Sequence, residues 1–419
     1  MTHTPPAERP NREADAIDFD QALNYLLDHA QTMTGEMLLP LAECLGKVLA
    51  RSVEAGCDIP PVPISALDGY AINTADLADR GETCLPISQR IPAGQMGKPL
   101  ATGTAARIFT GAAMPANANA VLAQESTQLN HEMVCFSRRP TPLEDVKATG
   151  SDLKKGDRLL NIGRRLHPQD LALVASAGIN QLAVYRPLKV AILCTGDELI
   201  EPGQPLPPGS TYNANRYLVP AQIQVLGMDT LIVNRVADTL IDTQAALIDA
   251  MAQADVVLTT GGVSVGEEDH IRAAIKSLGE LHIWRVNMKP GKPFTFGLLG
   301  MQKTPILGLP GNPVSAFLNF ALLARPFLLR CQGIEEHQRV SLRLPAGFEW
   351  PTPRHHREFL RARIDPDDPL SRVTLYPNQG SSALISTTWA NGIAVIHESQ
   401  TLSVGDLVEF IPLSSMNLY

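Results

Sequence analysis

A glycine pair followed by three acids forms the most chemically suggestive stretch of the chain, DVVLTTGGVSVGEED at Asp255–Asp269. Gly261 and Gly262 allow a tight turn or a close approach to a ligand. A helix that begins beyond such a turn presents backbone N–H groups to phosphate. The three acids, of which Asp269 is the last, would repel a phosphate unless a cation lay between them. The stretch therefore predicts a combined metal and phosphate site.

Two other interpretations of this stretch stay open. Acids in a first helical turn are favourable partners of the helix dipole without any ligand. The string GVSVG at Gly262–Gly266 also matches the nucleophile elbow of α/β-hydrolases, with Ser264 as the nucleophile. Against the hydrolase interpretation, no acid and histidine follow in the order that a catalytic triad requires.

Alternating strands and helices are expected to position this stretch. LKVAILCTG, DTLIVNRVAD and DVVLTTGG predict strands, while NANRYLVPAQIQVLG, DTQAALIDAMAQ and HIRAAIKSLGEL predict helices. This alternation is typical of a doubly wound parallel sheet, in which ligands bind beyond the carboxyl ends of the strands. Glu198, Asp238 and the loop Gly261–Asp269 all follow strand ends, so we expect them to converge. Convergence of these acids favours a metal site over a purely dipolar role.

Positive charge is expected at the same edge of the sheet. Lys289 and Lys292 belong to the proline-stiffened loop MKPGKP, and Arg285 lies just upstream. Lysine binds phosphate as a point charge and arginine as a fork. In GLPGNPVSA a turn precedes another helix, where Asn312 or Ser315 serves either as a cap or as an anion donor.

The rest of the chain predicts a multidomain fold of the α/β plus β class. Asp18–Ala30, Leu41–Ala50 and His167–Gly178 predict helices, and short β runs predict one β domain after Cys57 and another towards the C-terminus. We divide the chain into a disordered tail (1–16), an elongated mixed domain with helices (17–55 with 143–186), an inserted N-terminal β domain (56–142), a doubly wound α/β domain (187–334) and a C-terminal β-barrel-like domain (335–419).

Composition limits the partners and the compartment. The formal net charge of −8 argues against non-specific binding to nucleic acid or anionic membrane. Six cysteines without a C-x-x-C pair predict reduced structural thiols rather than zinc or disulfides. The N-terminus lacks a signal-peptide core, and the apolar segment Phe317–Leu329 is interrupted by Arg325 and Pro326. We therefore expect a cytoplasmic protein that binds neither nucleic acid nor membrane.

An ordered set of strings resembles one known family. PPVPISALDGYAI, RIFTGAAMP, GSDLKKGD, VAILCTGDELIEPG, TTGGVSVGEEDH, KPGKPF and GLPGNPVSA are similar to the molybdopterin molybdenumtransferase family, the MoeA-type proteins related to the gephyrin E domain. The resemblance covers nearly the whole chain. It implies insertion of molybdate into adenylylated molybdopterin, with Mg²⁺-dependent cleavage of the pyrophosphate and release of AMP. It also implies an elongated homodimer in which Asp68 completes the site of the other subunit.

The resemblance also assigns roles to individual residues. It implies catalytic roles for Asp68, Glu198, Asp238, Asp269 and Lys289. It makes Glu198, Asp238 and Asp269 the metal ligands. It implies ligand binding by Thr110, Asp152, Gly261, Gly262, Ser264, Arg285, Lys292, Ser315, Arg357 and Ser381. Without the resemblance, Asp68 and Thr110 are ordinary turn residues, and Arg285 stands where many relatives carry lysine.

Two further functions stay open at this point. A pterin adenylyltransferase shares the glycine-loop domain, and a pterin-adenylylating protein is also a candidate partner of this chain. A gephyrin-like scaffold would need a long linker or a fused partner domain, which these residues do not contain.

Overall fold

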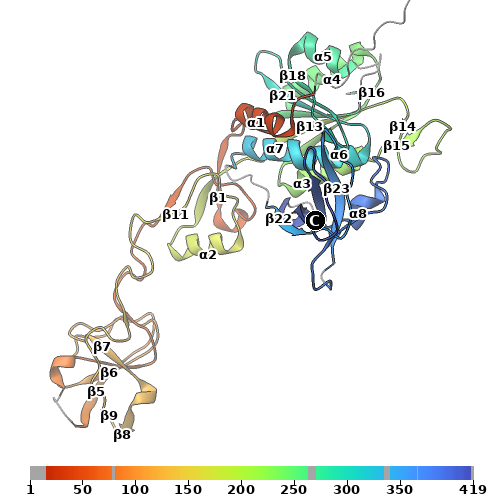
Figure 1. Cartoon of the computed structure of the whole chain (residues 1–419). Coiled ribbons are helices and arrows are strands. Elements are labelled where there is room, and N and C mark those ends of the chain that lie inside the picture. Colours follow the sequence, from red (N-terminus) through yellow and green to blue (C-terminus); the bar gives the residue numbers. More distant parts are fainter. Residues whose placement is uncertain (1–15, 78–80, 263–269, 335–339, 366, 417–419) are drawn as a thin grey trace, which may run out of the picture.

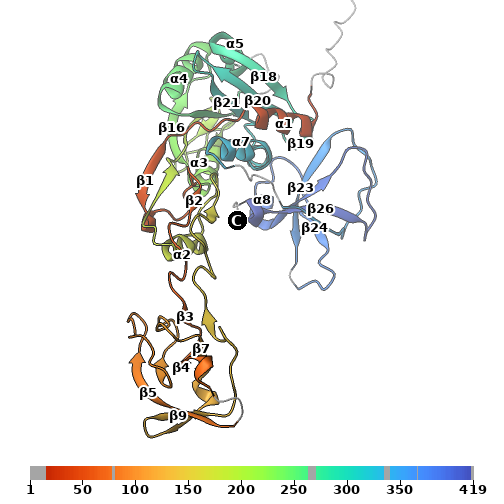
Figure 2. The ribbon, with the colours of Figure 1, turned by 90° about the vertical axis from the view of Figure 1, so that its left-hand side faces the viewer.

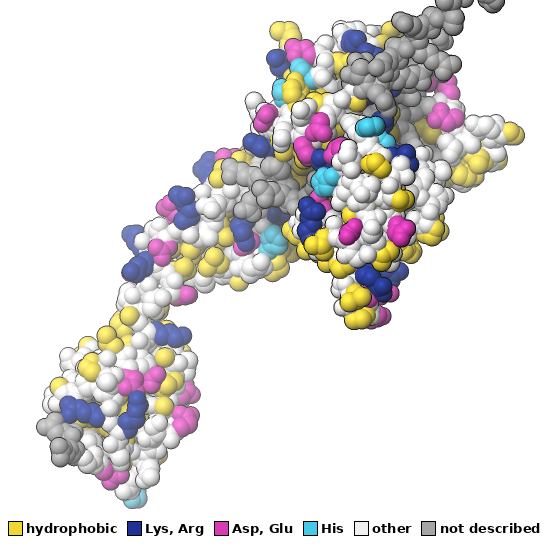
Figure 3. Space-filling view, viewed as in Figure 1, with side chains coloured by type: hydrophobic (Ala, Val, Ile, Leu, Met, Phe, Trp, Pro, Cys, Tyr) yellow, Lys and Arg dark blue, Asp and Glu magenta, His cyan; other side chains and the backbone are white. Residues whose placement is uncertain are grey.

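The computed structural model of the chain describes residues 16–77, 81–262, 270–334, 340–365 and 367–416. The molecule is elongated, with a small β domain at one end and the α/β and C-terminal domains together at the other (Figures 1 and 2). In the space-filling view the β domain joins the rest through a narrow neck (Figure 3). The predicted disordered tail at 1–16 lies, except for its last residue, outside the described residues.

The small β domain is a six-stranded sheet in the order β7-β4-β6-β5-β9-β8. Alternating apolar side chains fill a core on each face of the sheet, for example Ile72 and Leu122 in one core and Ile91 and Ile108 in the other. Its strands are β4 (Gly69–Ile72), β5 (Thr83–Ile91), β6 (Ala105–Ile108), β7 (Ala120–Ala123), β8 (Gln128–Asn130) and β9 (Met133–Phe136). The chain segments that join this domain to the rest contain the short pair β3 (Ile64–Ser65) and β10 (Val146–Lys147).

A disulfide joins Cys84 on β5 to Cys135 on β9. The two cysteines occupy directly paired positions of the antiparallel ladder. The prediction of six reduced cysteines is therefore wrong for this pair. The two residues are 51 positions apart, so only the register of the sheet reveals that they are neighbours.

The middle of the molecule combines two short antiparallel pairs with one helix. The strands are β1 (Glu36–Pro40) with β12 (Gln181–Tyr185) and β2 (Val53–Glu54) with β11 (Arg158–Leu160), and the helix is α2 (Pro168–Ser176). The prediction of a helix at Leu41–Ala50 is wrong, because only Leu41–Glu43 form a 3₁₀ turn. Beyond it, Val48 and Leu49 form bridges to Arg165 and Val184, so tertiary pairing overrides the local helical pattern.

The α/β domain is built on a six-stranded sheet in the order β16-β13-β17-β21-β20-β18. The strands are β13 (Lys189–Thr195), β16 (Asp229–Val236), β17 (Val256–Thr260), β18 (Gly279–Arg285), β20 (Pro293–Leu299) and β21 (Thr304–Leu309). Helices α3 (Asn215–Val225), α4 (Leu240–Gln253) and α5 (His270–Leu278) follow as expected. The sheet is mixed rather than fully parallel, which corrects the prediction, because β20 pairs antiparallel with both β18 and β21.

One long helical run packs beneath this sheet. It comprises α6 (Pro313–Asn319), a π-helical turn (Phe320–Ala324) and α7 (Arg325–Cys331). Arg325 and Pro326 interrupt the run of apolar side chains but not the helix, because Pro326 follows the π-helical turn and lies in the first turn of α7, where a proline is tolerated. The run is long and apolar enough to cross a membrane, but its apolar window is 94% buried inside the protein. It is the central helix of the core.

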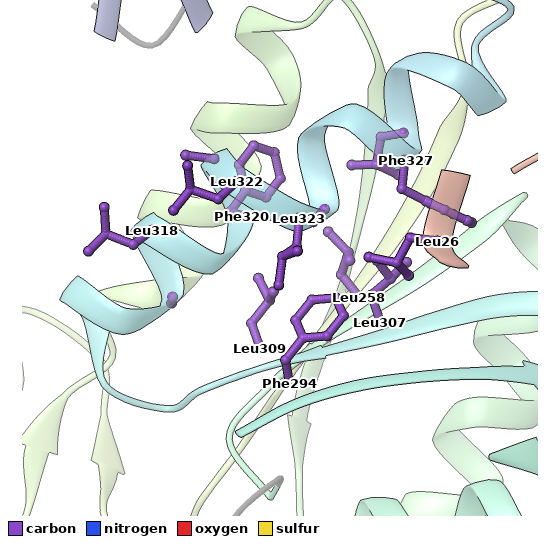
Figure 4. Close-up of a cluster of buried hydrophobic side chains, with 14 of the residues drawn as sticks. Leu26, Leu258, Phe294, Leu307, Leu309, Leu318, Phe320, Leu322, Leu323 and Phe327 are labelled. Carbon is purple, nitrogen blue, oxygen red and sulfur yellow. The ribbon is translucent and has the colours of Figure 1, made fainter. Parts of the chain in front are cut away.

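Helix α1 (Phe19–His29) also belongs to this core. Asp18 caps it by accepting hydrogen bonds from the backbone N–H groups of Asp20 and Gln21, as predicted. Its buried Leu26 lies beside Leu258 and Leu307 of the sheet and Phe327 of α7 (Figure 4). Helix α1 therefore packs against the α/β domain, while the division of the chain into domains stays a prediction.

The C-terminal domain is a sheet in the order β19-β23-β25-β26-β22, with β24 paired to β23. The strands are β19 (Met288–Lys289), β22 (Leu342–Pro345), β23 (Arg357–Ile364), β24 (Val373–Leu375), β25 (Gly392–Ile396) and β26 (Leu407–Pro412). A bridge between Ala346 and Val373 brings the two ends of the sheet together. Its edge strand β19 comes from the lysine loop of the α/β domain, so the two domains share a ladder.

Candidate active site at the junction of two domains

A cleft of about 510 Å³ lies between the strand ends of the α/β domain and the C-terminal domain. Seven residues singled out from the sequence line it: Glu198, Gly261, Gly262, Lys289, Asn312, Ser315 and Ser381. The remaining lining residues are Pro290, Gly291, Pro293, Pro310, Gly311, Gln379 and Gly380. The cleft therefore receives residues from five separate segments of the chain.

The glycine pair after β17 forms the floor of the cleft. Gly261 and Gly262 have φ values of +87° and +64°. A Cβ atom on Gly261 would lie 2.6 Å from the carbonyl oxygen of Thr195, and one on Gly262 would lie 2.8 Å from Cγ1 of Ile271. Glycine is required at both positions for the turn and for the close packing. The hydroxyl of Thr195 is buried there and has no hydrogen-bond partner among the described residues.

The lysine loop forms one wall and is held from below by the core helix. Gly291 has φ +93°, and a Cβ atom there would lie 2.2 Å from Nδ2 of Asn319. The fully buried Asn319 amide donates to the carbonyl oxygen of Gly291 at 3.2 Å. Asn319 therefore fixes the loop that carries Lys289 against the helix that carries Ser315. The sequence does not single out Asn319, because its position inside an apolar helix is typical of a core residue.

The C-terminal domain contributes the opposite wall through the turn Asn378–Ser381. Arg361, only 1% exposed, donates to the carbonyl oxygen of Gly380 at 3.0 Å and to the hydroxyl of Ser386 at 2.9 Å. Burial lowers the pKa of the Arg361 guanidinium to about 10. Arg361 thus holds the turn that presents Ser381 to the cleft. This role was also missed, because the run RHHREFLRAR suggests a solvated basic strand.

Lys289 reaches the cleft from a strand that both domains share. It pairs with Glu358 across the β19–β23 ladder. Its Nζ lies 3.5 Å from Oε1 of Glu358, while 57% of its side chain remains exposed. The ammonium group is therefore anchored on one side and accessible to an anion on the other.

Of the acidic residues predicted as metal ligands, only some can be located relative to the cleft. Glu198 lines the cleft after β13, and Asp238 follows β16, the strand next to β13 in the sheet. Asp238 is not among the described lining residues. Within the described ranges, no group of three or more His, Cys, Asp or Glu side chains could hold a metal ion. Asp269 and Ser264 lie outside the described residues.

Arg357 is not among the described residues that line the cleft. Its Nη1 and Nη2 donate to the two carboxylate oxygens of Asp20 at 2.7 and 2.8 Å, and Nη2 also donates to Glu398 at 3.2 Å. The side chain is 7% exposed. Arg357 therefore joins α1 to the C-terminal sheet. Lys292 and Arg285 are half-buried and are not among the described residues that line the cleft.

Asp68 and Thr110 come together at the opposite end of the molecule. Asp68 directly precedes β4, which lies in the β domain far from α6 and β19 (Figures 1 and 2). Hydrogen bonds to the carboxylate from the backbone N–H and then the hydroxyl of Thr110 lower the pKa of Asp68. Asp152 is exposed in the neck, where its N–H donates to Ile59. None of these three residues lines the cleft of the same chain.

These features define a multidomain protein whose α/β domain presents a lysine, a serine hydroxyl and glycine turns towards a second serine of the C-terminal domain. Three family models match the chain in order: the MoeA N-terminal region (domain I and II) at residues 17–178, a probable molybdopterin binding domain at 191–330 and the MoeA C-terminal region (domain IV) at 343–413. The chain belongs to the MoeA-type molybdopterin molybdenumtransferase family.

Individual relatives support this assignment. A molybdopterin molybdenumtransferase of Haemophilus influenzae is 36% identical over 77% of this chain and 80% of its own length. One of Nostoc is 33% identical over 79% of this chain and 78% of its own length. The crystal structure of a molybdopterin biosynthesis MoeA protein from Pyrococcus horikoshii OT3 has a TM-score of 0.83 at 26% identity, covering 95% of this chain and all of that chain (100%).

Proposed function

We propose that this protein is a molybdopterin molybdenumtransferase, which inserts molybdate into adenylylated molybdopterin and releases AMP. The observation that carries the proposal is the cleft, in which Lys289, Ser315 and Ser381 converge from two domains. An ammonium group and hydroxyl donors are suited to a tetrahedral oxyanion. Relatives with this name cover most of the chain, and the matches to both the N-terminal and C-terminal family models favour this activity over an adenylyltransferase.

Different residues of the cleft would bind the two anions, molybdate and the pyrophosphate of the nucleotide. Lys289 neutralises an incoming oxyanion, and Ser315 and Ser381 orient it through their hydroxyl groups. Gly261 and Gly262 line the cleft, and the tight turn that only glycine allows there exposes backbone to which the pyrophosphate of the nucleotide can bind. Binding both substrates in one cleft places the mutually repelling anions in contact.

Carboxylates at the strand ends would hold Mg²⁺. Glu198 on the cleft and Asp238 after the neighbouring strand are the oxygen donors that this ion prefers, and Asp269 is the third predicted ligand. When bound, Mg²⁺ would neutralise the negative charge on the pyrophosphate oxygens and so facilitate cleavage of the pyrophosphate bond.

The site is proposed to be completed by a second copy of the chain. Asp68 and Thr110 lie too far along the elongated molecule to reach the cleft of their own chain (Figure 2). In a homodimer, the β domain of one subunit would bring both residues to the cleft of the other subunit, and Asp152 in the neck would lie nearby.

A pterin-adenylylating protein is the proposed supplier of the nucleotide substrate. We place the enzyme in the cytoplasm, without a nucleic-acid or membrane partner.

The test is release of AMP from purified adenylylated molybdopterin on addition of molybdate and Mg²⁺. We expect Lys289→Ala to reduce the rate at least tenfold, because removal of one aimed charge costs on the order of 1.4 kcal/mol or more of transition-state stabilisation. Lys276→Ala, which alters an exposed lysine of α5, is the matched control and should keep the rate. Equal rates for wild type and Lys289→Ala would contradict the proposed site.

Two other results would indicate a function different from the proposed one. Consumption of ATP with free molybdopterin would identify an adenylyltransferase instead. Stoichiometric binding of a receptor without any turnover would identify a scaffold protein.

A further inference from the structure

A buried carboxylate beside the cleft is shared by two basic side chains. Glu358 on β23 is 2% exposed. Its Oε1 lies 3.5 Å from Nζ of Lys289 and 3.4 Å from Nε2 of His356. Its Oε2 is buried and has no hydrogen-bond partner among the described residues. A buried carboxylate that is only partly hydrogen-bonded is unstable without a positive partner, so Glu358 depends on Lys289 or His356 for neutralisation.

The start of β23 brings His356, and not Arg357, to this carboxylate. Adjacent side chains of a strand lie on opposite faces. Arg357, the first residue of β23, therefore points away from Glu358 and binds Asp20. His356 directly precedes β23 and contacts Glu358, and the parallel register of Lys289 with Glu358 brings the lysine to the same carboxylate.

We propose that His356 and Glu358 form a proton-coupled counter-charge for Lys289 in the oxyanion subsite. Without an anion, Lys289 neutralises Glu358. When an oxyanion enters the cleft, the Lys289 ammonium group turns towards it, and His356 takes up one proton from solvent and neutralises Glu358 in its place. This inference rests on the proposed function, since it assumes that the cleft binds molybdate. His356 and Glu358 are positioning residues in this account.

The charged groups around His356 are consistent with such an exchange. Glu358 faces it from its own strand, and Lys289 and Lys292 face it from β19 and the following loop. Burial, reinforced by the two lysines, lowers the pKa of His356 despite the opposing effect of Glu358. The imidazole is therefore largely neutral near pH 7 before the anion binds. Movement of Lys289 away from it and towards an anion removes one repulsion and raises its pKa, which drives proton uptake.

The test is calorimetric titration of inorganic molybdate into the full-length protein. Binding is measured at about pH 7 in buffers of different ionisation enthalpy, which gives the number of protons taken up per anion, and across about pH 6 to 8, where histidine titrates. We expect wild type to take up a substantial fraction of a proton and to bind roughly three- to tenfold more weakly at the upper end of this range.

Variants separate the role of His356 from a general effect. His356→Gln should abolish the proton uptake and flatten the pH dependence. His356→Lys carries a permanent charge and should bind molybdate tightly over the whole range without proton uptake. His355→Gln, which changes the exposed histidine one position earlier, is the matched control and should retain the uptake of wild type.

The outcomes are distinguishable from failure of the proposed function. Unchanged proton uptake in His356→Gln, or no uptake by wild type, overturns the proton-coupled exchange, while a loss of molybdate binding in Lys289→Ala still supports the subsite. Absence of molybdate binding by wild type overturns both.

Discussion

Asp68 and Thr110, 42 positions apart in the sequence, are joined by two hydrogen bonds of 2.8 Å. The backbone N–H and the hydroxyl of Thr110 both donate to Oδ1 of Asp68. The second carboxylate oxygen has no hydrogen-bond partner among the described residues and is open to another one. The pair therefore forms a small preorganised acidic group at the end of the molecule opposite the cleft.

Subunit mixing tests whether this group completes the cleft of a partner subunit. Asp68→Ala and Lys289→Ala should each be inactive alone. Dissociated and reassociated together, they should recover about a quarter of wild-type activity, since half of the dimers are mixed and each mixed dimer has one intact site of two.

The control for this experiment mixes Asp68→Ala with Thr110→Ala. Both changes lie in the same β domain, so a mixed dimer has one defect in each shared site and should stay inactive. Recovery in this control, or none in the first mixture, would contradict a shared site.

Gly291→Ala should weaken both the fold and molybdate binding. Its Cβ atom would lie 2.2 Å from Nδ2 of Asn319, so the lysine loop must shift. We expect the free energy of unfolding to fall by about 2 kcal/mol more than in Gly405→Ala. Gly405 is the matched control, because its φ of +94° is nearly the same as the +93° of Gly291 and no atom lies within 4 Å of the added Cβ. Urea denaturation and molybdate titration measure both effects; equal losses in the two variants would show that the contact with Asn319 is unimportant.

Arg357→Gln should reduce stability without affecting molybdate affinity. The change removes a bidentate ion pair with Asp20 and a contact with Glu398, which we expect to cost about 2 kcal/mol. Asp20→Asn should cost less, because the Asp20 side chain is 57% exposed. A tenfold loss of molybdate affinity in Arg357→Gln with unchanged urea denaturation would place Arg357 in the binding site, as the family resemblance implied.

The disulfide predicts a definite thiol count. After denaturation without reductant, four thiols should react, and the exposed Cys57 should react before the buried Cys44, Cys194 and Cys331 in the native protein. Six should react after reduction. Cys84→Ser with Cys135→Ser should destabilise the β domain by about 2–4 kcal/mol. Six reactive thiols before reduction would contradict the bond.

Local sequence patterns predicted those parts of the fold that depend on local chemistry. The Asp18 cap, the apolar strands β13 and β17 and the helix α5 follow from periodicity and capping, and they are confirmed. The helix expected at Leu41–Ala50 is wrong, because pairing with a strand more than a hundred residues later decided that segment. Periodicity carries no information about such pairing.

Only those residues of the site that line the cleft directly could be predicted from the sequence. Glycine turns, Lys289 and Ser315 follow strand ends or begin a helix, so topology alone brings them together. Asn319, Arg361 and Glu358 act from behind the lining residues, and their types and spacing resemble those of core or surface positions. The direction of Arg357 depends on the register of β23, which the sequence does not specify.

The most direct measurement is anomalous scattering from a crystal soaked with molybdate, AMP and Mg²⁺. We predict molybdate in the cleft, within hydrogen-bond distance of Lys289, Ser315 and Ser381. Molybdenum bound only elsewhere, with this cleft filled by water, would contradict it.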